Sequence, residues 1–181
     1  LQVRGCKIGV LLEAGDGGNT IDGNAIAGNQ TGLRIAPEAK GNVVEGNRIG
    51  ADRAGGTADA NEVGMFVGGS DNVIGGRNVI SGNGHSGVAI YGSTGNKVWG
   101  NYIGTVEGGG SARRNDSNGV YLIASANSNY IGGTGANQGN IISGNFNRGI
   151  YVTDSGTQNT VIAGNYIGTD VDGTAPLGNN Y

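Results

Sequence analysis

The sequence predicts an all-β fold: a right-handed parallel β-helix, or β-solenoid, of about six coils plus a partial one, with three short strands per coil. Three observations favour it, namely 40 glycines among 181 residues, a phrase that recurs six times, and apolar residues at the same place in each copy. Short strands bounded by Gly and Asn cannot bury a face alone, so each copy must stack on the next. Right-handed winding is expected because crossovers between parallel strands of one sheet have that hand.

The repeated phrase reads Gly-Φ-x-Φ, a turn, Asn-x-Φ-x-Gly, then Asn-x-Ile-x, where Φ is apolar. Its copies start at Gly9, Gly32, Gly64, Gly87, Gly119 and Gly149. The intervals are 23, 32, 23, 32 and 30 residues, so short and long copies alternate. Apolar and polar residues alternate over three to five positions, which is the period of a strand.

Four files of apolar side chains are expected to fill the interior. The first strand of each copy supplies two files, Val10, Leu33, Met65, Val88, Val120 and Ile150, then Leu12, Ile35, Val67, Ile90, Leu122 and Val152. The middle strand supplies Ile21, Val44, Ile74, Val98, Ile131 and Val161, with Ile162 as an alternative because the last copy has an extra residue. The last strand supplies Val3, Ile26, Ile49, Ile80, Ile103, Ile142 and Ile167.

Asparagine recurs at two turns of every copy. One file is Asn19, Asn42, Asn72, Asn96, Asn129 and Asn159, and the other is Asn24, Asn47, Asn78, Asn101, Asn140 and Asn165. Stacked amides can hydrogen-bond one another and the turn backbone, which satisfies polar groups that the coil would otherwise bury unpaired. The phrase GNYIGT, at 100–105 and again at 164–169, is therefore expected to build the coil rather than to react.

Charge and composition exclude several classes of partner. The net charge is −3 without a basic run, which argues against nucleic acid. No apolar stretch approaches the roughly 18 residues of a membrane span. Cys6 is the single cysteine, so it cannot form an internal disulfide, and we expect a small buried turn residue rather than a reactive thiol.

Long insertions distinguish the long copies from the short ones. They follow Ile49, Ile103 and Ile167, and they are expected at the same corner of alternate coils, about 10 Å apart along one edge. Loops on a rigid scaffold often carry recognition, so this edge is a natural place for a partner. The chain opens inside a coil and closes inside an insertion. We therefore expect residues 1–181 to be a single domain, either a fragment of a longer repeat protein or a unit that stacks end to end on another copy.

The segments NVISGNGHSGVAIYG, NIISGNFNRGIYV and NYIGTDVDGTAPLGN resemble the repeats of right-handed parallel β-helices in large secreted or cell-surface bacterial proteins. The resemblance covers nearly the whole chain and implies a secreted or cell-surface location. It is specific for the fold and not for the function, because this pectate-lyase-like superfamily also includes pectate lyases, polygalacturonases, uronan epimerases, phage tailspikes and adhesins.

A polysaccharide-processing enzyme, a lyase, hydrolase or epimerase, is the alternative function. Its candidate residues are Asp22 and Glu45, which face outward on adjacent coils about 5 Å apart, the spacing of a retaining glycosidase pair. Lys97 is the candidate base, but it lies two coils from Glu45. The chain lacks the Asp-Asp and Gly-His-Gly of polygalacturonases, and its one histidine, His85, fits a turn. A solvated carboxylate pair is the plainer interpretation.

Aromatic residues suggest a binding surface instead. The outward positions of the first strand are Leu11, Arg34, Phe66, Ala89, Tyr121 and Tyr151, and the last strand adds Tyr102 and Tyr166. Exposed rings can lie against sugar rings while Arg34 donates hydrogen bonds, so Phe66, Tyr121, Tyr151 and Arg34 are the candidate ligand-binding residues. The same residue types also pack against cross-strand neighbours on any sheet.

Calcium is a further possibility at DVDG, residues 170–173, where Asp170 and Asp172 have the carboxylate spacing of a calcium loop. The other ligands of such a loop are missing, so we expect a solvated turn and no cofactor. The function that the sequence favours is a non-catalytic structural or adhesive module of a secreted or surface protein that contacts glycans.

Overall fold

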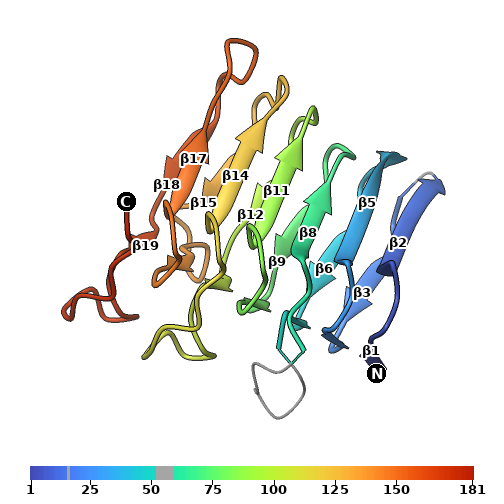
Figure 1. The fold of residues 1–181 in the computed structure, drawn as a ribbon. Helices are drawn as coiled ribbons and strands as arrows, with labels where there is room; N and C mark the ends of the chain where they lie inside the picture. The colour runs from blue at the N-terminus through green and yellow to red at the C-terminus, as the bar shows by residue number, and fades with distance from the viewer. Residues whose placement is uncertain (16, 52–58) are drawn as a thin grey trace.

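The computed structural model describes residues 1–15, 17–51 and 59–181, and this part of the chain winds into a coil of short strands (Figure 1). The strands form three sheets that run along the coil. The first sheet contains β2 (Ile8–Gly15), β5 (Thr31–Ala39), β8 (Val63–Val67), β11 (Val88–Tyr91), β14 (Val120–Ile123) and β17 (Ile150–Val152). The second contains β3 (Thr20–Asp22), β6 (Val43–Glu45), β9 (Val73–Gly75), β12 (Lys97–Val98), β15 (Tyr130–Gly132) and β18 (Val161–Ala163). The third contains β1 (Gln2–Val3), β4 (Ala25–Ile26), β7 (Arg48–Ile49), β10 (Val79–Ile80), β13 (Tyr102–Ile103), β16 (Ile141–Ile142) and β19 (Tyr166–Ile167).

Every strand pair in these sheets is parallel, so the expected six coils plus a partial one are confirmed. We number the coils 1 to 6 from β2–β3–β4 to β17–β18–β19, with β1 as the partial coil. In the described ranges there is no helix that is long and apolar enough to cross a membrane.

The interior contains the predicted apolar files. Ile80 pairs with Ile103, and Ile103 pairs with Ile142, with all three side chains fully buried. At roughly 25 cal/mol per Å² of buried apolar surface, such stacked aliphatic side chains are the main stabilising contribution of each coil. The repeated phrase therefore specifies the core directly.

The register of the last coil corrects the predicted middle file. Ile131 pairs with Ile162, not with Val161, which pairs with the outward Tyr130. The alternative residue Ile162 is thus the right one. The extra residue of this copy is accommodated before β18, in the turn where Asn159 has a left-handed φ of 56°.

The same extra residue moves Asn159 out of the first predicted asparagine file. Asn19, Asn42, Asn72, Asn96 and Asn129 are linked from one coil to the next by side-chain hydrogen bonds. Thr160, and not Asn159, follows Asn129 in register, because Val161 N donates to Asn129 O as Tyr130 N donates to Asn96 O. Its Oγ1 is buried and has no hydrogen-bond partner among the described residues. The second file, from Asn24 to Asn165, is confirmed along its whole length.

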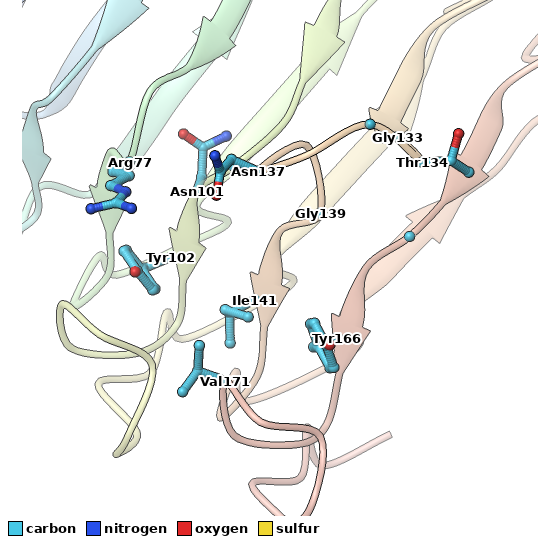
Figure 2. Close-up of a pocket in the computed structure, with 13 residues that line it drawn as sticks. Arg77, Asn101, Tyr102, Gly133, Thr134, Asn137, Gly139, Ile141, Tyr166 and Val171 are labelled. Atoms are coloured by element: carbon cyan, nitrogen blue, oxygen red, sulfur yellow. The ribbon is translucent and has the colours of Figure 1, made fainter.

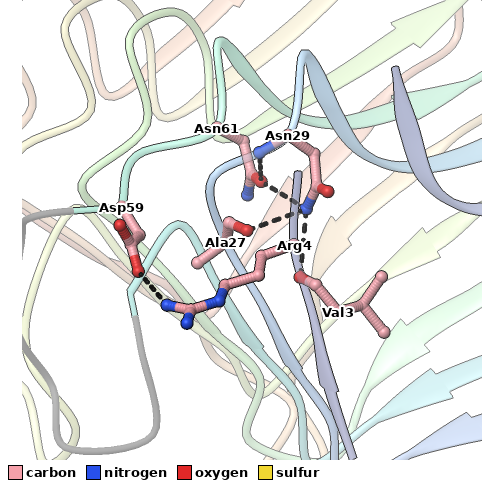
Figure 3. A network of polar contacts seen from close by, with 6 residues as sticks. All are labelled: Val3, Arg4, Ala27, Asn29, Asp59 and Asn61. Carbon is pink, nitrogen blue, oxygen red and sulfur yellow. Dashed lines mark hydrogen bonds and ion pairs between the residues drawn. The ribbon is translucent and has the colours of Figure 1, made fainter. Parts of the chain in front are cut away.

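A third asparagine ladder lies at the remaining corner. Its members are Asn29, Asn61, Asn83, Asn115, Asn145 and Asn179. Figure 3 shows its beginning, where Asn29 Nδ2 donates to Ala27 O at 3.0 Å, Val3 O at 3.2 Å and Asn61 Oδ1 at 3.0 Å. Beside the ladder, Arg4 forms an ion pair with Asp59 at 3.2 Å.

Cys6 occupies the ladder position before Asn29, and its backbone N donates to Asn29 Oδ1 at 3.0 Å. The expectation that Cys6 is buried was wrong, because its side chain is exposed. Cys6 follows β1 in the partial coil, and among the described residues no coil covers that end of the ladder.

The insertions after Ile103 and Ile167 lie at the same corner, as predicted, and fold in the same way. Arg113 N donates to Gly104 O, and Leu177 N donates to Gly168 O, both at 2.8 Å. Isolated antiparallel bridges join Thr105 to Ala112 and Thr169 to Pro176. Residues 52–58 of the insertion after Ile49 lie outside the described residues.

Candidate ligand-binding surfaces

The outer side of the first sheet has the predicted row of aromatic and cationic residues. Strand pairing aligns Leu11, Arg34, Phe66, Ala89, Tyr121 and Tyr151. We call Arg34, Phe66, Tyr91, Tyr121, Arg148 and Tyr151 the aromatic face. Figure 1 shows the strands of this sheet side by side along the coil. The core files behind them hold the outward residues in register.

Two groups of contacts organise the aromatic face. At one end, the Arg34 guanidinium lies 5.4 Å from the centre of the Phe66 ring, and Phe66 and Tyr91 stack with their centres 5.7 Å apart. At the other end, Tyr121 and Tyr151 stack at 5.4 Å with their planes only 9° apart. The candidates Phe66, Tyr121, Tyr151 and Arg34 thus share one face but form two clusters.

Ring stacking determines what the aromatic face can offer a ligand. Tyr121 and Tyr151 turn their ring faces toward each other, and the Arg148 guanidinium lies over Tyr151 at 4.4 Å. Burial, together with the neighbouring Tyr151, raises the pKa of Tyr121, so this phenol keeps its proton and can donate a hydrogen bond. The face therefore offers ring edges, hydroxyls and guanidiniums, with few free ring faces.

The alternative catalytic residues are only partly brought together. Asp22 and Glu45 pair directly between β3 and β6. Lys97 belongs to a different row of the second sheet, since it pairs with Val73 and Tyr130, and its amine lies 5.3 Å from the centre of the Trp99 ring. The carboxylates are neighbours, but the proposed base is directed to an aromatic ring.

The carboxylate of Asp170 serves the turn in which it lies. Its Oδ1 accepts hydrogen bonds from Thr174 N at 2.9 Å and Ala175 N at 3.2 Å. These bonds hold the pKa of Asp170 below its ordinary value. The described ranges contain no group of three His, Cys, Asp or Glu residues arranged to hold a metal ion. His85 is exposed in a turn of coil 3.

A groove that sequence reasoning missed lies on the outer side of coils 3 to 6, at the corner between the second and third sheets (Figure 2). Its volume is about 630 Å³. Tyr102, Ile141 and Tyr166 form its floor, because they pair in register on the outer side of the third sheet. Arg77 lies at one end of the groove. Val171, from the insertion after Ile167, lines the groove across from the third sheet.

One wall of the groove is a loop of coil 5, residues 133–139. Gln138 closes it, since its Oε1 accepts a hydrogen bond from Gly135 N at 2.9 Å, and Gly100 N donates to Gln138 O at 3.1 Å. A Cβ at Gly139 would lie 2.0 Å from Gly164 O, so only glycine fits this close approach of two backbones. The loop is therefore packed onto the coils on both sides of it.

A sequence signal for this loop exists. Asn129 and Asn140 of coil 5 are eleven residues apart, whereas the equivalent Asn96 and Asn101 of coil 4 are five apart. Comparing these intervals would have located an insertion at a second corner. The third asparagine ladder has a comparable signal, because each of its first five members stands three or four residues before the glycine that opens the next copy.

Comparison with known proteins identifies the architecture. A family model described as a right-handed beta helix region matches residues 2–168. Neither the curated proteins nor the solved structures that were compared give a match.

Proposed function

The chain belongs to the right-handed β-helix family, and we propose from this premise that it is a non-catalytic structural or adhesive module that contacts a polysaccharide through its aromatic face. The observation that carries the proposal is the alignment of Arg34, Phe66, Tyr121 and Tyr151 along a sheet whose inward residues are fully buried from coil 2 to coil 5. The resemblance to secreted and cell-surface repeat proteins supports a location where such polymers occur.

A long polymer suits this face better than a compact ligand. The row extends over coils 2 to 6, and successive coils are separated by about 4.8 Å, so contacts repeat along an extended line. Tyrosine hydroxyls and guanidiniums donate hydrogen bonds of the kind that sugar hydroxyls accept. Each contact is weak, and affinity is expected to arise from their number.

Retention on immobilised polysaccharides tests the proposal. The triple change Phe66→Ser, Tyr121→Ser and Tyr151→Ser should reduce retention severalfold while the fold survives, because the inward files are unchanged. The matched control is Tyr130→Ser, which removes a tyrosine that is 42% exposed on the second sheet. Equal loss in both proteins, or no loss in the triple variant, would contradict the assignment of this face.

An enzymatic function is the second candidate, and the pairing of Asp22 with Glu45 is the observation that favours it. Paired residues on adjacent strands are about 5 Å apart, which is close to the separation of the two carboxyls in a retaining glycosidase. Turnover of a polysaccharide that is lost in both Asp22→Asn and Glu45→Gln would support this candidate over the first.

A further inference from the structure

We propose that the groove on coils 3 to 6 is a second binding site, separate from the aromatic face, and that it takes a short acidic saccharide. Sugar rings lie against Tyr102 and Tyr166, and the carboxylate or sulfate of the saccharide meets Arg77. The groove and the aromatic face are on different sheets, so this inference does not rest on the proposed function.

The floor of the groove matches the dimensions of a sugar chain. Tyr102 and Tyr166 stand two coils apart with Ile141 between them, which places them about 10 Å apart along the coil axis. Figure 2 shows this order, with Arg77 on the side of Tyr102 that is away from Tyr166. Ile141 itself is buried, so the groups that an extended saccharide would contact are the two tyrosine rings and the guanidinium of Arg77.

The tyrosines of the floor differ from those of the aromatic face in their ring contacts. Tyr121 and Tyr151 stack on each other, whereas neither Tyr102 nor Tyr166 stacks on another ring in the described part of the chain. Tyr166 is 44% exposed. Flat apolar ring faces with polar hydroxyl tips suit a ligand that has apolar faces and polar edges.

Arg77 supplies the charge of the groove. It is the single charged residue in the lining, in a chain whose net charge is −3, and among the described residues it has no ion-pair partner. A guanidinium pairs well with carboxylates and sulfates because its N–H groups match two oxygens. The lining therefore selects an acidic ligand over a neutral one.

The backbone of Arg77 gives an independent indication. Arg77 has a left-handed φ of 64°, at the position before the ladder asparagine. The equivalent position of other coils is a glycine with positive φ: Gly23, Gly46, Gly100 and Gly164. A side chain is disfavoured in this conformation, and residues held in it cluster at functional sites, so an arginine at this position is consistent with a role for its side chain.

The remaining polar groups fit sugar hydroxyls. Thr134 and Asn137 line the loop wall beside exposed glycine backbone, and all of these groups are uncharged. Asn101 also borders the groove, but its side chain is engaged with Ile74 O and Asn140 in the ladder. Specificity should thus come from Arg77 and the two rings.

The test is calorimetric titration of the full chain with three tetrasaccharides of the same β-1,4 linkage: cellouronic acid tetramer, sulfated cellotetraose and cellotetraose. The Arg77→Gly variant should bind the preferred acidic tetramer about tenfold more weakly, as expected for loss of a charged hydrogen bond. Its melting temperature should be unchanged or higher, because glycine relieves the left-handed strain. Tyr102→Ser should weaken binding of every tetramer that binds.

The controls separate this site from the aromatic face and from general charge. Arg113→Gln removes a guanidinium that belongs to neither the groove nor the aromatic face, and it should leave tetramer binding intact. The triple serine variant of the aromatic face should also retain tetramer binding, because that face is expected to gain its affinity from many contacts along a polymer. The stronger of the two acidic tetramers identifies the acidic group. Equal binding of cellotetraose, equal loss in Arg113→Gln, or undiminished binding in Arg77→Gly would overturn the inference, while retention on polymers would still test the aromatic face separately.

Discussion

A ladder asparagine makes several hydrogen bonds at once, and this determines what its loss costs. Asn101 is almost fully buried; its Nδ2 donates to Ile74 O at 2.9 Å and Asn140 Oδ1 at 3.0 Å, and its Oδ1 accepts from Asn78 Nδ2 at 2.9 Å. Removing the amide leaves its buried partners unpaired, and each unpaired group costs about 1–3 kcal/mol.

We expect Asn101→Ala to lower the free energy of unfolding by about 3 kcal/mol, from the loss of these buried bonds. Asn127→Ala is the control, because the hydrogen bonds of Asn127 are exposed. Urea denaturation of the two variants measures the difference. Equal midpoints would mean that the ladder contributes no more than a surface turn does.

Ile103 tests the core in the same way. It is fully buried, so Ile103→Asp places a carboxylate among apolar side chains and should cost several kcal/mol, at least about 4, or force its protonation. Asp116→Ala removes an exposed ion pair with Arg114 and should cost less than about 1 kcal/mol. Thermal melts with similar shifts for both variants would contradict the register.

Individual residues also show which parts of the fold could be predicted from the sequence. The file from Ile26 to Ile167 could be predicted because a constant Asn-x-Ile spacing fixes each member. Asn159 was misplaced because a single extra residue can be accommodated on either side of a turn, and only pairing in the sheet decides between the two. Pattern alone left Val161 and Ile162 open for the same reason.

At the scale of the element, the loops depend on glycines that have different roles. A Cβ at Gly139 would meet a backbone carbonyl, whereas one at Gly110, in the insertion after Ile103, would meet nothing within 4 Å. Gly139→Ala should therefore displace the loop 133–139 and reduce binding in the groove, and Gly110→Ala should not. Hydrogen exchange at Gly100, whose N–H donates to Gln138 O, reports the displacement. Equal protection of Gly100 in both variants would show that the loop tolerates the change.

The turn of the last insertion should depend on pH. Hydrogen bonds from Thr174 N and Ala175 N lower the pKa of Asp170 below its ordinary value of 3.8. A lowered folded-state pKa contributes stability that is fully present well above pH 3.8 and is lost as the pH falls through the folded-state pKa. Amide exchange at Thr174 should therefore accelerate as the pH falls through the folded-state pKa of Asp170. The Asp170→Asn variant should lose this pH dependence. Asp172→Asn is the control and should retain it.

The elements differ in how visible they are in sequence. The insertions after Ile103 and Ile167 were predictable because both follow the same Ile-Gly, and their matching bridges confirm a common fold. The groove was not predicted, because the residues that line it come from four coils. The loop that forms its wall shows in the sequence only as part of the 30-residue interval between Gly119 and Gly149. Which side chains meet across coils depends on loop paths that a repeat pattern does not encode.

In the whole molecule, the aromatic face and the groove lie on different parts of the coil. The aromatic face lies on the first sheet, and the groove lies at the corner between the second and third sheets. The insertions follow strands of the third sheet. Because these surfaces share only the buried core, we expect them to act independently. In a variant that combines Arg77→Gly with the aromatic-face triple serine change, tetramer binding should fall as in Arg77→Gly alone, and polymer retention should fall as in the triple serine variant alone. Titration with the preferred acidic tetramer and retention on polymer measure the two losses, and a marked further loss in either measurement would indicate one shared site.

The central claim is that this β-helix binds a polysaccharide without converting it. The most direct test incubates the chain with soluble uronate polymers and follows both binding, by gel mobility, and the ultraviolet absorbance of unsaturated chain ends. We expect retarded mobility that weakens in the Phe66, Tyr121 and Tyr151 triple variant, with flat absorbance throughout. A rising absorbance that Asp22→Asn or Glu45→Gln abolishes would instead show conversion and make that carboxylate pair an active site.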